Sequence, residues 1–157
     1  MTGVVVVDTN LLLLLIVGAA SREYVGKHKR LRDYSLDDLD LLVELIGQFP
    51  DMVLLPHILA EVSNLARQID NPARAKIQKT LRTLVETSTE LPIQSIYGVQ
   101  RREFDELGLT DAMILHLCSL SGNGISPTLI TVDTTLADSA NSLGYSVIDY
   151  KEEYLSG

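Results

Sequence analysis

Hydrophobic and polar positions follow one another in blocks that predict a strand and then a helix at the start of the chain. Four consecutive valines at 4–7 predict a buried strand, because β-branched side chains favour extended backbone. The leucine-rich run over 11–20 predicts a helix, with Thr9 or Asn10 as the residue that caps it. Because the valine strand shows no alternation with polar residues, we expect both of its faces to be buried.

The same alternation continues to the end of the chain. Ser35 and Asp38 have the spacing of a capping box, and apolar residues recur after them at helical intervals, so a helix is predicted there. Thr110 is expected to cap a later helix. Further strands are predicted over 52–55, 128–132 and 145–148, and further helices over 56–69, 71–86, 100–107, 111–120 and 134–143. This order predicts an α/β fold, a three-layer α/β/α sandwich with a mostly parallel central sheet.

Length and composition restrict the class of protein. The 157 residues, 46% of them hydrophobic, suit a single domain over 1–157 with one core. One cysteine and three histidines argue against an internal disulfide and a structural zinc site.

The apolar run at 11–20 is shorter than the roughly 20 residues that span a membrane, and residues 1–10 lack the basic start of a signal peptide. We therefore expect a cytoplasmic protein without a membrane partner.

The net charge of −8 argues against a protein that coats nucleic acid generally, but it does not exclude a nuclease. The densest basic run holds Lys27, Lys29, Arg30 and Arg32, which are candidates for contacting RNA phosphates. Such a run of charges is slightly more often a solvated surface loop than an RNA contact. Two more candidate groups are Arg74, Lys76, Lys79 and Arg82, and Arg101 with Arg102.

Two acidic residues directly follow predicted strands. Asp8 ends VVVV and Asp133 ends TLITV. Ligand sites of open parallel sheets lie beyond the carboxyl ends of the strands, where both acids are expected. Taken alone, each is equally well explained as a helix N-cap.

Two further acids lie on predicted helices. Glu61 shares the apolar face of its helix with Ile58 and Leu65, where a carboxylate is unusual. Asp111 lies in the first turn of its helix, on the side that carries Ile114. Glu61 can alternatively be an edge residue whose charged end reaches solvent. Asp111 can alternatively be a favourable negative charge at the positive end of the helix dipole.

Together the four acids indicate a metal site. Clustered carboxylates repel one another unless a cation lies between them. Carboxylate oxygens suit hard cations such as Mg²⁺ or Mn²⁺. Such an ion lowers the pKa of its bound water, so the pattern Asp8, Glu61, Asp111 and Asp133 favours metal-assisted hydrolysis of phosphodiester bonds.

The chain resembles the PIN-domain nuclease family in four stretches that occur in the family's order. They are VVDTN at 6–10, LAEV at 59–62, GLTDA at 108–112 and TVD at 131–133. The combination is specific although each stretch alone is weak, and the resemblance covers essentially the whole chain. In size the chain is similar to the single-domain toxins of bacterial and archaeal toxin–antitoxin modules.

The resemblance implies an activity and a role for each matched residue. Asp8, Glu61, Asp111 and Asp133 would be the catalytic, metal-binding acids of a Mg²⁺- or Mn²⁺-dependent endoribonuclease that leaves a 5′-phosphate and a 3′-hydroxyl. Thr9 or Asn10 would orient Asp8, and Thr110 would position Asp111. A homodimer and a small antitoxin protein are the implied partners. The chain departs from the pattern at Thr135, where many relatives carry an acid, so one or two ions remain possible.

The acids and the residues after the first predicted strand bear on three alternatives to a nuclease. An aspartate-nucleophile phosphatase needs a second Asp two residues after the first, where this chain has Asn10. A dinucleotide-binding module needs a glycine-rich turn after the first strand, and DTNLLL has no glycine. A PIN-like RNA- or protein-binding module with weak or no nuclease activity is the remaining alternative, and the presence of all four acids argues against it.

Overall fold

A five-stranded, fully parallel sheet organises the chain. The structure is a computed structural model, and it describes residues 3–122 and 125–150. The strand order is β3-β2-β1-β4-β5, which places the valine strand β1 at the centre. The strands are β1 (Val4–Val7), β2 (Asp51–Leu54), β3 (Thr89–Glu90), β4 (Pro127–Thr131) and β5 (Ser146–Asp149).

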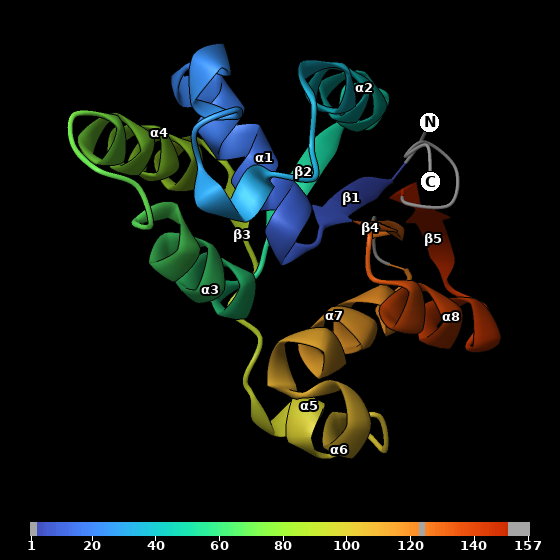
Figure 1. Cartoon of the computed structure of the whole chain (residues 1–157). Coiled ribbons are helices and arrows are strands. Elements are labelled where there is room, and N and C mark those ends of the chain that lie inside the picture. The colour runs from blue at the N-terminus through green and yellow to red at the C-terminus, as the bar shows by residue number, and fades with distance from the viewer. Residues whose placement is uncertain (1–2, 123–124, 151–157) are drawn as a thin grey trace.

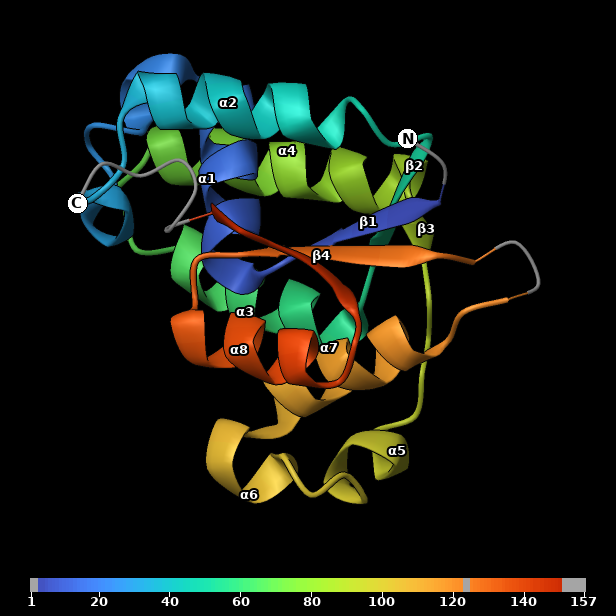
Figure 2. The same cartoon turned by 90° about the vertical axis from the view of Figure 1, so that its right-hand side faces the viewer.

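Helices cover both faces of this sheet, which confirms the predicted α/β architecture. Figures 1 and 2 show α1, α2 and α4 on one side of the strands and α7 and α8 on the other. The helices are α1 (Thr9–Ala20), α2 (Leu36–Ile46), α3 (Pro56–Ala66), α4 (Ala73–Thr87), α5 (Ile96–Val99), α6 (Phe104–Leu107), α7 (Leu109–Ser119) and α8 (Thr134–Ser142). Two short 3₁₀ turns, η1 (Arg22–Tyr24) and η2 (Lys29–Leu31), lie between α1 and α2.

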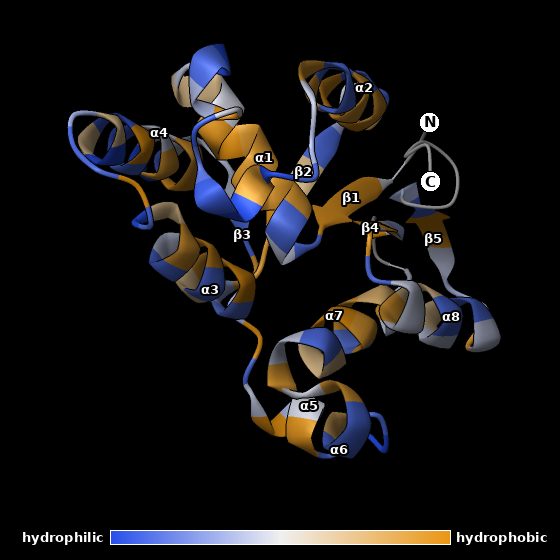
Figure 3. Cartoon of the chain, viewed as in Figure 1, coloured by the Kyte–Doolittle hydropathy of each residue, from blue (hydrophilic) through white to orange (hydrophobic). Residues whose placement is uncertain are grey.

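The leucine-rich helix α1 is part of the core. Leu11, Leu13 and Leu14 are fully buried, and α1 packs against α2, α3 and α4. β1 and most of α1 are accordingly hydrophobic in Figure 3. Leu11, Leu13 and Leu14 therefore offer no apolar surface to a second subunit, because neighbouring helices already cover them. In the described part of the chain, no helix has the length and apolar character needed to cross a membrane.

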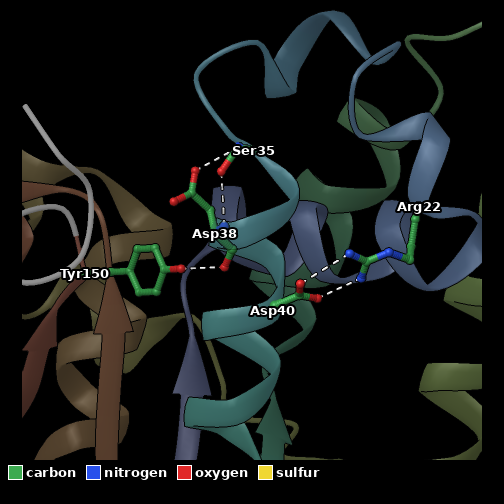
Figure 4. A network of polar contacts seen from close by, with 5 residues as sticks. All are labelled: Arg22, Ser35, Asp38, Asp40 and Tyr150. Atoms are coloured by element: carbon green, nitrogen blue, oxygen red, sulfur yellow. Dashed lines mark hydrogen bonds and ion pairs between the residues drawn. The ribbon is translucent and has the colours of Figure 1, made fainter.

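The start of α2 confirms the predicted capping box. Ser35 Oγ accepts from the Asp38 amide at 3.2 Å, and the Asp38 carboxylate accepts from the Ser35 amide at 2.8 Å. The same turn is tied to the end of the sheet, because the Tyr150 hydroxyl donates to the Asp38 carbonyl (Figure 4). An ion pair between Arg22 and Asp40 joins α2 to η1 at 2.7 Å.

We expect Ser35→Ala to lower the free energy of unfolding by about 1 kcal/mol, the usual cost of losing an N-cap side chain. Ser35→Thr, which keeps a hydroxyl acceptor, should cost only a few tenths of a kcal/mol. Urea unfolding followed by circular dichroism measures both. Equal stabilities of the Ala variant and the wild type would mean that the capping box does not stabilise α2.

Two predicted helix starts are wrong. The side chain that caps α1 is Asp8 rather than Thr9 or Asn10, and it accepts from the Thr9 amide at 2.7 Å, which confirms the N-cap alternative given for Asp8. Helix α7 begins at Leu109, so Thr110 lies inside the helix and does not cap it. Gly108, with a φ of +86°, forms the sharp turn that permits this start, in a conformation that other residues rarely adopt.

Some element boundaries also differ from the sequence prediction. The helix expected over 100–107 is reduced to α6, because residues 100–103 form turns between it and α5. The two-residue strand β3 was not predicted, because Thr89 and Glu90 are exposed and carry no hydrophobic pattern. These differences lie away from β1 and β4, the strands that position the candidate site.

The order of strands fixes where a ligand can bind. From β1 the chain moves outward to β2 and β3, and it later returns to the other side of β1 to form β4 and β5. β1 and β4 are paired in register, with Val7 opposite Ile130. Their carboxyl ends therefore flank the position where the strand order reverses, which is the usual ligand site of an open α/β sheet.

Candidate metal centre

The four predicted acids line one cleft at this reversal point. The cleft has a volume of about 650 Å³. Its lining residues come mainly from the first turn of α1, from α3, from the first turn of α7 and from the residue before α8. These segments lie near one another in Figure 1. We call it the acid cleft, after the carboxylates that line it: Asp8, Glu61, Asp111 and Asp133.

Asp8 is the most deeply buried of these acids, with 7% of its surface exposed. One carboxylate oxygen accepts from the Thr9 amide, and the other accepts from the Thr131 hydroxyl at 2.7 Å. Burial raises the pKa of Asp8 above its ordinary value, and the charges of Asp133 and Glu61 add to this, while the hydrogen bonds from Thr131 and Thr9 oppose it. Asp8 is thus held rigidly in a position that disfavours its own charge.

Thr131 has a role that the sequence analysis missed. It is fully buried at the last position of β4, its hydroxyl donates to Asp8, and the Asp133 amide donates to it at 3.0 Å. Thr131 therefore links the two acids that follow β1 and β4. The only sequence signal is a hydroxyl in a strand position otherwise suited to valine, two residues before Asp133.

Glu61 lies in the acid cleft but is exposed. The prediction that it faces the core is therefore wrong, and the alternative of an edge residue that reaches solvent is confirmed. The face of α3 that carries Glu61 is only partly covered by the core. Ile58 on this face is buried, whereas Leu65 is partly exposed and lines the cleft. The Thr110 hydroxyl donates to one Glu61 oxygen, and the Thr9 hydroxyl donates to the other at 3.5 Å. Thr110 therefore orients Glu61. The resemblance had implied that Thr110 positions Asp111 instead.

Asp111 is half-buried in the first turn of α7. Burial, together with the charges of Asp8, Asp133 and Glu61, raises the pKa of Asp111 to about 7. The four carboxylates are thus close enough to influence one another electrostatically. A cation among them would reverse that repulsion.

Asp133 combines both of the roles weighed for it. It caps α8, because one carboxylate oxygen accepts from the amides of Thr135 and Leu136 at 3.0 and 3.2 Å. The same side chain lines the acid cleft. Thr135 occupies the position where the resemblance would place a further acid, and it lines a separate hollow between α8 and the segment that includes α6.

The donor chemistry of the acid cleft fits a hard divalent cation, since all four groups are carboxylates. However, within residues 3–122 and 125–150 no three His, Cys, Asp or Glu side chains already form a group that could hold one ion. Asp8 and Glu61 instead direct their oxygens to amide and hydroxyl donors. A shared ion would need carboxylates to turn away from these donors.

The polar neighbours of the acids complete the cleft. Asn10 and Asn64 line it. Of the two residues implied to orient Asp8, Thr9 does so through its backbone amide. Among the described residues, Asn10 makes no hydrogen bond to Asp8. Asn64 was not predicted, but it lies three residues after Glu61, on the same side of α3.

The predicted basic run divides between two hollows. Arg30, on η2, lines the acid cleft and supplies a positive charge there. Lys27 and Lys29 line a neighbouring hollow instead, and the exposed Arg32 lines neither.

Comparison with known proteins adds no assignment. The chain matches no protein-family model and no curated protein.

Proposed function

We propose that the protein is a Mg²⁺- or Mn²⁺-dependent endoribonuclease that hydrolyses RNA phosphodiester bonds in the acid cleft. The observation that carries the proposal is the convergence of four carboxylates, from four separate segments, on the reversal point of a parallel sheet. Arg30 on the rim supports a phosphate-bearing substrate, because an arginine pairs well with phosphate oxygens. The stretches that resemble the PIN-domain family support the same reaction.

Each side chain has a distinct part in this proposal. Asp8, Glu61, Asp111 and Asp133 would hold the ion, which when bound would supply an activated water and charge stabilisation at the phosphate. Thr131 fixes the orientation of Asp8. Thr9 and Thr110 fix Glu61 in a similar way. Arg30 would bind a phosphate oxygen and so align the RNA backbone with the acids.

The biological setting is a further part of the proposal. The resemblance to single-domain toxins supports a cytoplasmic ribonuclease that is neutralised by a small antitoxin and acts as a homodimer. Sedimentation would give the molecular mass of a dimer. Purification with the product of a neighbouring reading frame would identify the antitoxin.

A cleavage assay tests the proposed reaction. Purified protein is incubated with a pool of end-labelled single-stranded RNAs in Mg²⁺, in Mn²⁺ and in excess chelator. We expect cleavage only with the ions, and fragments with a 5′-phosphate and a 3′-hydroxyl. Cleavage that continues unchanged in chelator would overturn the metal-dependent mechanism.

Thr131→Val should lower metal-dependent activity roughly ten-fold while leaving the fold intact. Valine has the shape of threonine but cannot donate to Asp8, and loss of such a supporting hydrogen bond usually costs 10–100-fold in metal affinity or activity. Activity is measured with saturating Mn²⁺ and again across an Mn²⁺ titration. Thr128→Val, a change of the same kind at a part-exposed site on β4, is the matched control. An unchanged Mn²⁺ dependence in Thr131→Val would argue against the role given to Thr131.

A binding module without nuclease activity is the second candidate. It is favoured by the hydrogen bonds that already satisfy Asp8 and Glu61, and by the lack of a ready three-ligand group in the described part of the chain. On this alternative the purified protein would bind RNA or a protein partner, and its affinity would be the same in Mn²⁺ and in chelator.

A further inference from the structure

A second hollow, beside the acid cleft, collects positive charge in an otherwise acidic protein. It has a volume of about 440 Å³ and lies where the segment before η2 meets the end of α3 and the start of α4. We call it the basic pocket, after the cations that line it: Lys27, Lys29, Arg67 and Arg74. Asp70 is the one acid in its lining. The net charge of the whole chain is −8, so this concentration of cations is not a consequence of composition.

Among the residues that the structure describes, no ion pair joins a cation of the basic pocket to an acid. In the described ranges, the ion pairs join Arg22 to Asp40 and both Arg101 and Arg102 to Glu103. Lys27, Lys29 and Arg67 are exposed, while Arg74 is half-buried and donates to the Ile69 carbonyl at 3.0 Å. Four positive charges that gather in a hollow with a single acid favour the binding of an anionic ligand.

A buried histidine holds the basic segment against α3. His28 is 1% exposed, and its Nδ1 accepts from the Arg30 amide at 3.2 Å. Burial lowers the pKa of His28, an effect opposed by the nearby backbone of Ala66 and Leu65 at the end of α3. His28 therefore lies against the end of α3, and this places the backbone of the two flanking lysines beside that helix end.

The basic pocket and the acid cleft share the same two elements. On η2 and the residues before it, Lys29 lines the pocket and the next residue, Arg30, lines the cleft. On α3, Glu61 lines the cleft and Arg67, directly after the helix, lines the pocket. Six residues of helix correspond to about 9 Å along its axis, so the two sites are neighbours.

We propose that the basic pocket binds the phosphates of an RNA strand whose scissile bond lies in the acid cleft. This inference rests on the proposed function, because it takes RNA as the substrate of the cleft. An RNA strand carries one negative charge per nucleotide, so a strand that passes from the acid cleft to the pocket presents phosphates at both sites. Arg30 would contact the strand between them. Cations that contact phosphates position a strand without reading its sequence.

The test measures binding separately from cleavage. A fluorescent single-stranded oligouridylate of twelve nucleotides is titrated in excess chelator, and anisotropy is recorded at several salt concentrations. The test variant is Lys29→Gln with Arg67→Gln, both exposed positions in the pocket. The matched control is Lys76→Gln with Arg82→Gln, which removes the same charge from exposed positions of α4 outside the pocket. These two residues belong to another basic group that the sequence offered for RNA contact, so the pair of variants compares the two candidate surfaces directly.

We expect the pocket variant to bind the RNA roughly ten-fold more weakly at 0.1 M salt, and its salt dependence to be less steep by about 1.4 in log–log slope. The control variant should stay within about two-fold of the wild type. Equal losses in both variants, or no loss in either, would overturn the inference. A polyglutamate peptide that binds the wild type as tightly as the RNA does, with the same loss in the pocket variant, would also overturn it in favour of an acidic protein partner.

Failure of this inference is distinguishable from failure of the proposed function. If the protein cleaves RNA but the pocket variant binds and cleaves like the wild type, the pocket assignment fails and the nuclease assignment stands. If no preparation cleaves RNA but binding is lost only in the pocket variant, the pocket assignment stands and the nuclease assignment fails.

Discussion

Asp8→Asn should reduce metal-dependent RNA cleavage by more than about a hundred-fold, since changes to supporting residues alone often cost 10–100-fold. Asn keeps the size of the side chain and can accept the hydrogen bond that the Thr9 amide gives to Asp8. What it removes is the negative charge that would bind the cation. Asp138→Asn, on an exposed part of α8 outside the acid cleft, is the matched control and should cleave normally. Cleavage by Asp8→Asn at the wild-type rate would contradict the proposed mechanism.

The same variant should be more stable than the wild type when no divalent ion is present. Burial raises the pKa of Asp8, which means that its ionised form is less favourable in the folded than in the unfolded chain. Removing the charge therefore increases the free energy of unfolding at neutral pH. Loss of activity together with a gain in stability separates a functional charge from a structural one, because a damaged fold would lose both.

Asp111→Asn should stabilise the metal-free protein at pH 8 by about 2 kcal/mol and remove much of its pH dependence. The pKa of Asp111 is raised to about 7 from an ordinary value of 3.8. A shift of this size corresponds to roughly 4 kcal/mol, which we halve because the side chain is only partly shielded from solvent. Between about pH 4 and pH 7 the folded state binds more protons than the unfolded state. Stability therefore falls as the pH rises through that window.

Thermal unfolding in chelator, at pH values from 5 to 8, measures this effect. The wild type should melt at progressively lower temperature toward pH 8, and Asp111→Asn should show a flatter profile. Added Mn²⁺ should restore the stability of the wild type at pH 8 and have little effect on the variant. Parallel pH profiles for the two proteins would show that Asp111 does not carry the charge repulsion assigned to it.

The sequence was sufficient to predict the layers of the fold and the acids of the cleft. The valine strand, the capping box at Ser35 and the alternation of strands and helices depend on local patterns, and the structure agrees with them. Asp8 and Asp133 could be placed at one edge because parallel strands end at the same edge of a sheet. None of these inferences needed the order of the strands.

Features that depend on contacts between distant segments could not be predicted in the same way. Thr131 meets Asp8 only because β4 lies beside β1, although 123 positions separate the two residues. Thr110 looked like a helix cap, but its hydroxyl reaches Glu61 on α3. The leucine-rich run predicts a helix, but only the folded chain places α2, α3 and α4 over that helix.

The basic run illustrates the same limit. Its residues are neighbours in sequence, yet Arg30 lies in the acid cleft while Lys27 and Lys29 join Arg67 and Arg74 in the basic pocket. A 3₁₀ turn sends consecutive side chains in different directions, and α3 and α4 supply the remaining cations. The charge pattern along the chain identifies the segment but not how its residues divide between the two hollows.

Calorimetric titration of Mn²⁺ into the metal-free protein tests the central claim most directly. We expect saturable binding to the wild type, at least ten-fold weaker binding to Asp8→Asn and to Asp133→Asn, and unchanged binding to Asp138→Asn. The absence of saturable heat with the wild type, or equal affinity in all four proteins, would contradict the claim that the acid cleft is a metal centre.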